Sequence, residues 1–120
     1  MQTLTNTQAA ITPNLIADIC AKIVAAIHPV KIIMFGSQAD GTATADSDLD
    51  LFVIHDLPEP SRMVRRQIDR LFLHRWFSLD VIARNPQQVA ANVADNNPFY
   101  TEHLLKRGVI LYDRQQQTPS

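Results

Sequence analysis

Two aspartates, Asp48 and Asp50, stand two positions apart at the start of an apolar run. Successive side chains of a strand point to opposite faces, so these carboxylates share one face while Leu49, Leu51 and Val53 share the other. Neighbouring carboxylates repel each other and aspartate is uncommon in strands, so a divalent cation such as Mg²⁺ is the natural partner of such a pair. The alternative is a solvated strand edge, on which acidic side chains discourage aggregation.

A glycine–serine pair, Gly36 and Ser37, directly follows the apolar stretch 30–35. Glycine lets a ligand approach the backbone closely because it has no side chain. Backbone N–H groups at a strand-to-helix turn, with a serine hydroxyl beside them, can hold a phosphate. Alone this signal is weak, since Gly-Ser pairs also occur in ordinary turns.

A third carboxylate, Asp80, interrupts the apolar run 77–83. If this strand neighbours the one that begins at Asp48, Asp80 joins the other two carboxylates. Three carboxylates can hold two metal ions about 3.5–4 Å apart, which clamp the attacking and leaving oxygens of a phosphoryl or nucleotidyl transfer. The alternative is a lone strand aspartate that pairs with Arg84.

Together these residues resemble a known signature: Gly36-Ser37, ten further residues, Asp48 and Asp50, then a later strand with Asp80. The pattern is similar to that of the polymerase-β-type nucleotidyltransferase superfamily. The resemblance covers about residues 30–83 and extends more loosely to 108–112. The short length resembles the minimal nucleotidyltransferase (MNT) antitoxins encoded beside HEPN toxins. It implies the superfamily's α+β (mixed α/β) fold, a small mixed sheet flanked by helices.

The resemblance also implies roles. Gly36 and Ser37 would bind the triphosphate of ATP, Asp48 and Asp50 would hold two Mg²⁺ ions, and Asp80 would hold one ion and help deprotonate the incoming hydroxyl. AMP would pass to a hydroxyl, that of a tyrosine, on a HEPN-type toxin, which makes the protein an antitoxin.

One departure bears on those roles. Many relatives have a basic residue shortly after the Gly-Ser pair, where this chain has Asp40. Two other hypotheses therefore remain: a non-catalytic antitoxin that neutralises its toxin by contact, and a nucleotide-binding regulatory subunit.

The elements that must position these residues alternate between helical and strand patterns, as in a mixed α/β or α+β domain. Thr12 and Pro13 predict a helix start, and His28-Pro29 its end. We expect the other elements in this order: strands 30–35 and 48–54, a helix over 61–74, a strand over 77–83, helices starting at Asn85-Pro86 and Asn97-Pro98, and a last strand over 109–112.

Composition sets the remaining limits. The chain has 120 residues, 46% of them hydrophobic, and a net charge of −1, which suits one globular domain and argues against a dedicated duplex nucleic-acid binder. We expect a domain over residues 12–113 with flexible ends, 1–11 and 114–120. The single cysteine and the absence of a long apolar run favour a cytoplasmic protein without membrane contact.

Two further groups have competing interpretations. Four arginines on one face of the predicted helix 61–74 suit a solvated face better than contact with a triphosphate or an acidic partner: Arg62, Arg65, Arg66 and Arg70. We expect Trp76 and Phe77 to fill the core.

Overall fold

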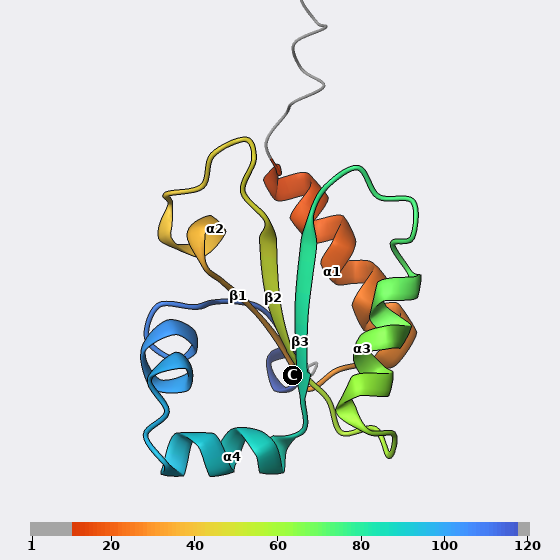
Figure 1. Cartoon of the computed structure of the whole chain (residues 1–120). Coiled ribbons are helices and arrows are strands. Elements are labelled where there is room, and N and C mark those ends of the chain that lie inside the picture. Colours follow the sequence, from red (N-terminus) through yellow and green to blue (C-terminus); the bar gives the residue numbers. More distant parts are fainter. Residues whose placement is uncertain (1–10, 118–120) are drawn as a thin grey trace, which may run out of the picture.

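The structure, a computed structural model, describes residues 11–117 and contains a four-stranded mixed sheet with helices on both faces (Figure 1). This confirms the predicted fold class. The expected flexible segment 1–11 lies, but for its last residue, outside the described residues, as do residues 118–120. The elements in chain order are α1 (Pro13–Ile27), β1 (Lys31–Phe35), α2 (Ser37–Asp40), β2 (Leu49–Ile54), α3 (Ser61–Arg70), β3 (Leu79–Arg84), α4 (Pro86–Ala94), the π-helix η2 (Phe99–Leu104), β4 (Val109–Asp113) and the 3₁₀ helix η3 (Arg114–Gln117).

The first helix begins and ends where the sequence predicts. The hydroxyl of Thr12 accepts a hydrogen bond from the Leu15 N–H (3.1 Å) and so caps the helix, with Pro13 following as first helical residue. His28 ends it in the left-handed conformation (φ 46°), and its N–H donates to the Val24 carbonyl.

The strand order is β3-β2-β1-β4. Strand β1 pairs antiparallel with β2 and with β4, whereas β2 and β3 are parallel. Parallel neighbours need a crossover, which α3 provides. The parallel register places Asp50 opposite Asp80, so the two strands that bear the predicted carboxylates are neighbours.

Each face of the sheet has its own apolar core. Helices α1 and α3 cover one face, and α4 and η2 cover the other (Figure 1). Strand alternation separates the two cores, because Leu49, Leu51 and Val53 face α1 and α3 while Phe52 faces η2. No helix among the described residues is long and apolar enough to span a membrane.

Four features near α3 and η2 differ from the predictions. Helix α3 ends at Arg70 rather than at residue 74, and β3 begins at Leu79 rather than at residue 77. Trp76 is 64% exposed and not in the core, because it lies on the loop between α3 and β3. Its ring contacts Phe77 edge-to-face. The last helix is a π-helix, in which the Leu105 N–H reaches the Tyr100 carbonyl.

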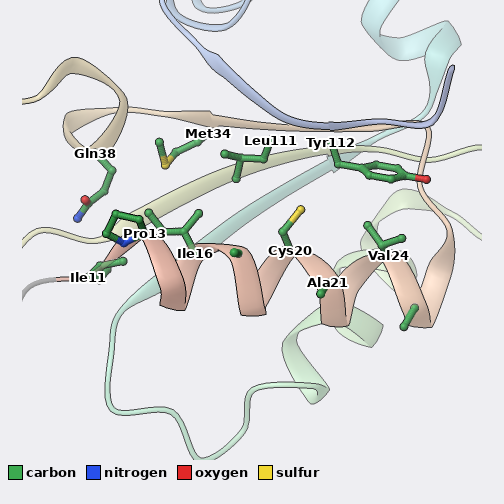
Figure 2. A pocket seen from close by; sticks show the side chains of 12 residues that line it. Ile11, Pro13, Ile16, Cys20, Ala21, Val24, Met34, Gln38, Leu111 and Tyr112 are labelled. Carbon is green, nitrogen blue, oxygen red and sulfur yellow. The ribbon is translucent and has the colours of Figure 1, made fainter. Parts of the chain in front are cut away.

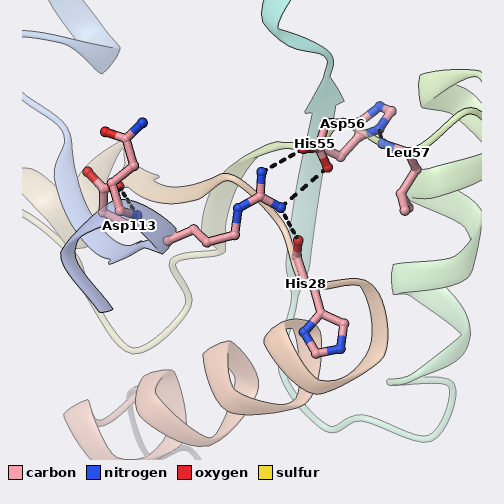
Figure 3. A network of polar contacts seen from close by, with 7 residues as sticks. His28, His55, Asp56, Leu57 and Asp113 are labelled. Carbon is pink, nitrogen blue, oxygen red and sulfur yellow. Dashed lines mark hydrogen bonds and ion pairs between the residues drawn. The ribbon is translucent and has the colours of Figure 1, made fainter. Parts of the chain in front are cut away.

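An ion pair joins three distant segments where the sheet ends (Figure 3). Arg114 Nη2 lies 2.6 Å from Asp56 Oδ2, and its Nη1 donates to the His28 carbonyl (3.1 Å). The Arg114 guanidinium lowers the pKa of the Asp56 carboxyl by hydrogen bonding and by charge. Arg114, expected in the flexible tail, therefore contacts the folded domain, although the boundary itself stays a prediction.

A buried histidine links β2 to α3 and α4. His55 is 1% exposed; its Nδ1 accepts from the Leu57 N–H (3.2 Å), so Nε2 carries the proton and donates to Ser61 Oγ (2.9 Å). Ser61 Oγ then donates to Gln88 Oε1 (2.8 Å), which also accepts from the Asn85 N–H. The chain of bonds is complete only with neutral His55.

This network predicts a pH dependence of stability. Burial lowers the pKa of His55 below its ordinary value of 6.5, more than the nearby Asp56 and Glu59 raise it. The unfolded chain therefore binds the proton more tightly than the native protein, and the free energy of unfolding falls as pH decreases below 6.5. Urea titrations of the wild type and of His55→Gln measure this. The variant costs about 1–3 kcal/mol at neutral pH and shows a flatter pH profile; an unchanged profile would contradict the assignment.

Candidate active site

The turn after β1 lies against the β2 carboxylate. Gly36 has φ 78° and ψ −156°, a backbone region that only glycine adopts readily. Phe35 pairs with Asp50 across β1 and β2, so Gly36 lies at the level of the Asp50 side chain. A Cβ at position 36 would overlap Asp50 Oδ2. Glycine is thus required both for the backbone angle and for room beside the carboxylate.

The three predicted aspartates gather at the same end of the sheet. Asp50 and Asp80 are register partners on parallel strands, and Asp48 immediately precedes β2. Asp50 is half-buried, while Asp48 and Asp80 are exposed. Burial first, then the charges of Asp80 and Asp48, raise the pKa of Asp50 to about 6. The three carboxylates therefore lie close enough to interact electrostatically.

An aromatic cluster lies on the same face of the sheet as Asp50 and was not foreseen from the sequence. Phe99 of η2 packs edge-to-face on Phe35 (ring centroids 5.2 Å apart) and on Phe52 (6.3 Å). Phe35 is the cross-strand partner of Asp50, and Phe52 is the next residue on the same strand face. Burial on this face is the largest cause of the raised pKa of Asp50. The sequence signal that could have indicated this cluster is Phe52, which stands two residues after Asp50 and therefore on the same strand face.

A hydrogen-bonded turn holds the segment before β2. The Thr44 N–H donates to Ser47 Oγ (2.8 Å), and the Ser47 N–H donates back to the Thr44 carbonyl (3.1 Å). This reciprocal pair orients the chain that enters β2 and thereby positions Asp48. Asp46, at the tip of the turn, is exposed and separate from the strand.

The four predicted arginines do not join this group. They project from α3, which packs on the sheet face opposite Asp50, and their side chains are exposed. Arg65 forms an i,i+4 ion pair with Asp69 (3.8 Å). The structure therefore favours a solvated face over contact with a nucleotide at the carboxylates.

The carboxylate oxygens of Asp48, Asp50 and Asp80 are ligands that suit Mg²⁺. A bound cation relieves the repulsion that the other two carboxylates exert on Asp50. The chemistry of the donors thus fits a divalent ion. Among residues 11–117, however, no three acidic, imidazole or thiol groups converge closely enough to form a ready-made metal site. Side-chain adjustment, with oxygens from water and substrate, would have to complete the coordination of an ion.

A family comparison agrees with this geometry. The model of the nucleotidyltransferase domain family matches residues 15–115, which include the glycine turn and all three carboxylates. The chain belongs to the nucleotidyltransferase domain family. No curated protein matches it.

Solved structures show the same fold at low sequence identity. A crystal structure of a Sulfolobus solfataricus protein, itself described only as a proposed nucleotidyltransferase, superposes with a TM-score of 0.60 at 17% identity, over 97% of this chain and 92% of that one. A chain of a toxin–antitoxin complex with AMP-PNP gives a TM-score of 0.55 at 20% identity, over 83% of this chain and 75% of that one.

Replacing Gly36 tests the contact between the turn and Asp50. Gly36→Ala forces an unfavourable backbone region and pushes a methyl group into the carboxylate, so we expect a loss of about 1–3 kcal/mol in unfolding free energy. Gly41→Ala is the matched control, because Gly41 also has positive φ (80°) but no atom within 4 Å of an added Cβ. Chemical denaturation distinguishes the two variants. Equal losses of unfolding free energy in Gly36→Ala and Gly41→Ala would contradict the contact between the turn and Asp50.

A second prediction concerns the charge of Asp50. Because its native pKa of about 6 lies above the ordinary 3.8, folding loses stability as pH rises from 3.8 through 6. Asp50→Asn removes this loss, and after solvent screening we expect a gain on the order of 1 kcal/mol above pH 6. Urea denaturation at acidic and neutral pH, without divalent ions, measures it. A variant less stable than wild type at neutral pH would contradict the repulsion.

Proposed function

We propose that this protein transfers AMP from ATP, with Mg²⁺, to a hydroxyl of a partner toxin and thereby acts as an antitoxin. The observation that carries the proposal is the position of Asp50, which lies opposite Asp80 and against Gly36. Membership of the nucleotidyltransferase domain family supports the reaction type, and the likeness to a chain of a toxin–antitoxin complex supports the setting. A tyrosine acceptor and a HEPN-type toxin follow from the motif's resemblance to minimal nucleotidyltransferases.

The proposed roles start from the turn. The bare backbone of Gly36 admits a phosphate, and the Ser37 hydroxyl offers a hydrogen bond to it. Asp48 and Asp50 would hold two Mg²⁺ ions, with Asp80 as a ligand of one. Bound Mg²⁺ would neutralise the carboxylates and the triphosphate oxygens.

Proton removal falls to Asp80. An oxygen of the acceptor hydroxyl attacks the α-phosphorus of ATP, the bond to the bridging oxygen breaks, and pyrophosphate leaves with the bonding electrons. Asp80 takes the hydroxyl proton. This role suits its position, because the side chain is exposed on β3, an edge strand of the sheet, where a large acceptor can reach it.

Asp40 supports the non-catalytic antitoxin as second candidate. It ends α2, three residues after Ser37, and is exposed where many relatives carry a basic residue. An acid there repels a triphosphate and lowers ATP affinity. Toxin binding with a weakened site would then suffice for neutralisation.

A labelling experiment tests the proposal. The protein is incubated with Mg²⁺, α-labelled ATP and a purified toxin encoded by the adjacent gene, and label on the toxin is located by mass spectrometry. We expect one or more AMP groups on tyrosine, with Asp50→Asn reducing the rate about 10²–10³-fold, the loss typical when a preorganised charge is removed.

Asp46→Asn and Asp48→Asn form a matched pair in the same exposed segment, and only the second should lose activity. Neutralisation of the toxin without any label transfer would favour the contact mechanism. Full activity in Asp48→Asn and Asp50→Asn would overturn the site.

A further inference from the structure

The loop between α3 and β3, residues 71–78, exposes large apolar side chains to solvent. Leu73 is 69% exposed and Trp76 is 64% exposed, the two highest fractions among the large apolar residues that the structure describes. Leu71 adds a third at 39%. Apolar residues that stand singly on a surface are ordinary, but a group of them on one short segment marks a contact site for another molecule.

This loop is anchored to the domain even though Leu73 and Trp76 face solvent. Phe72 is 7% exposed and belongs to the apolar core, and Phe77 packs against the same core. Their rings meet edge-to-face with centroids 6.4 Å apart, and Arg75 Nη1 donates to the Phe72 carbonyl (3.0 Å). Because the backbone is already held, a partner that contacts Trp76 does not have to order the loop first.

Positive charge borders the apolar part of the loop. A hollow of 330 Å³ next to the loop is lined by apolar side chains and by basic ones, which include Lys22, Arg70 and Arg75, and no carboxylate of the described residues lines it. Lys22 pairs with Asp18 of its own helix (3.3 Å), but within residues 11–117 no ion pair holds Arg70 or Arg75. These two guanidinium groups can therefore bind carboxylates of another molecule.

A larger hollow of the domain has a different character. It measures 830 Å³, runs between α1 and the sheet, and is lined by apolar residues such as Ile16, Met34 and Leu111 (Figure 2). No charged side chain of the described residues lines it. That groove offers no charge by which one partner would be selected, whereas the loop 71–78 combines apolar contacts with two available arginines.

The loop leads directly into the strand that bears Asp80. Trp76 stands four residues before Asp80, so their Cα atoms lie at most about 14 Å apart. A protein interface of ordinary size covers about 800 Å² on each partner, which is a patch roughly 16 Å in radius. Because β3 is an edge strand, a protein held by the loop can extend over that edge as far as Asp80.

We propose that the loop 71–78 is the docking surface for the acceptor protein, which meets it with an apolar contact bordered by carboxylates. This inference rests on the proposed transfer to a protein hydroxyl. Trp76 and Leu73 are the apolar anchors, since tryptophan is enriched among the residues that dominate binding free energy at interfaces. Arg70 and Arg75 pair with the acidic side chains around that contact and so orient the acceptor toward Asp80.

The neighbouring carboxylates favour a protein over an anionic membrane as the occupant. A bilayer of acidic lipids is negative along its whole surface and would bring that charge against Asp48 and Asp80, which are exposed at the end of the sheet where the loop enters β3. A protein can place its carboxylates opposite Arg70 and Arg75 and leave the region over Asp80 free of acidic groups. The loop therefore suits an acidic protein surface of limited extent.

Calorimetric titration with the purified toxin encoded by the adjacent gene, without ATP, tests this inference. Trp76→Ala should weaken binding about 30-fold, as expected for an interface anchor. We expect Leu73→Ala to weaken it about tenfold. Leu105→Ala is the matched control, because Leu105 is 59% exposed but lies just after η2, and it should leave the affinity unchanged. Circular dichroism checks that each variant folds.

Charge reversal tests the role of the arginines. Arg70→Glu should weaken toxin binding strongly at low salt and less at high salt, because salt screens the attraction. Arg107→Glu makes the same change at an exposed arginine after η2 and should have little effect. Equal affinities of Arg70→Glu and Arg107→Glu would contradict the acidic character of the partner.

Other occupants give different results. A wild type that does not bind the toxin, or equal affinities of Leu73→Ala and Leu105→Ala, would overturn the proposal. So would Trp76-dependent binding to vesicles of phosphatidylcholine and phosphatidylserine, which assigns the loop to a membrane, or Trp76-dependent dimerisation in ultracentrifugation, which assigns it to a second copy.

Label transfer is measured in a separate assay, at toxin concentrations below saturation. Toxin binding that depends on Trp76 without any label transfer would support the docking surface and contradict the proposed reaction. Label transfer that Trp76→Ala leaves unchanged would contradict the docking surface alone. The two proposals can therefore fail independently.

Discussion

The parallel pairing of β2 with β3 is the constraint on which the site depends. A parallel neighbour requires a crossover, and α3 supplies it while burying Val64 and Ile68 against the sheet. The apolar side chains of both strands fix the register, because a one-residue shift would turn every side chain to the other face. With that register set, Asp50 and Asp80 must lie side by side.

That register determines the electrostatic surroundings of Asp50. Burial, and then the charges of Asp80 and Asp48, raise the pKa of Asp50 to about 6, so the native protein keeps a charge in surroundings that disfavour it. Strained electrostatics of this kind are typical of functional sites, where a cation or a substrate supplies the missing compensation. Gly36 adds a second local constraint, because its bare Cα is what leaves room for the carboxylate.

The two edges of the sheet have different chemical character. At the β3 edge, Asp80 is exposed to solvent. The β4 edge adjoins an apolar groove and carries exposed Val109 and Ile110. Between these two edges, Tyr100 and Leu104 of the π-helix η2 pack on the sheet.

The sequence by itself determined the local features. Thr12 and Pro13 specified the start of α1, and Gly36 specified a turn after β1, because capping and backbone freedom depend on neighbouring residues alone. Strand alternation predicted one face for Asp48 and Asp50, but β2 begins at Leu49, so Asp48 lies just before the strand. The roles of these residues in metal and nucleotide binding stay predictions.

Only the tertiary structure decided which strands are neighbours. It brought Asp80 opposite Asp50, packed Phe99 against Phe35 and left Trp76 exposed. Each of these depends on contacts between segments far apart in the chain, whose free energy comes from burial summed over the whole core. The pattern of a few neighbouring residues carries no information about that total free energy. For this reason the sequence identified the candidate carboxylates but did not determine that Asp80 lies next to Asp50.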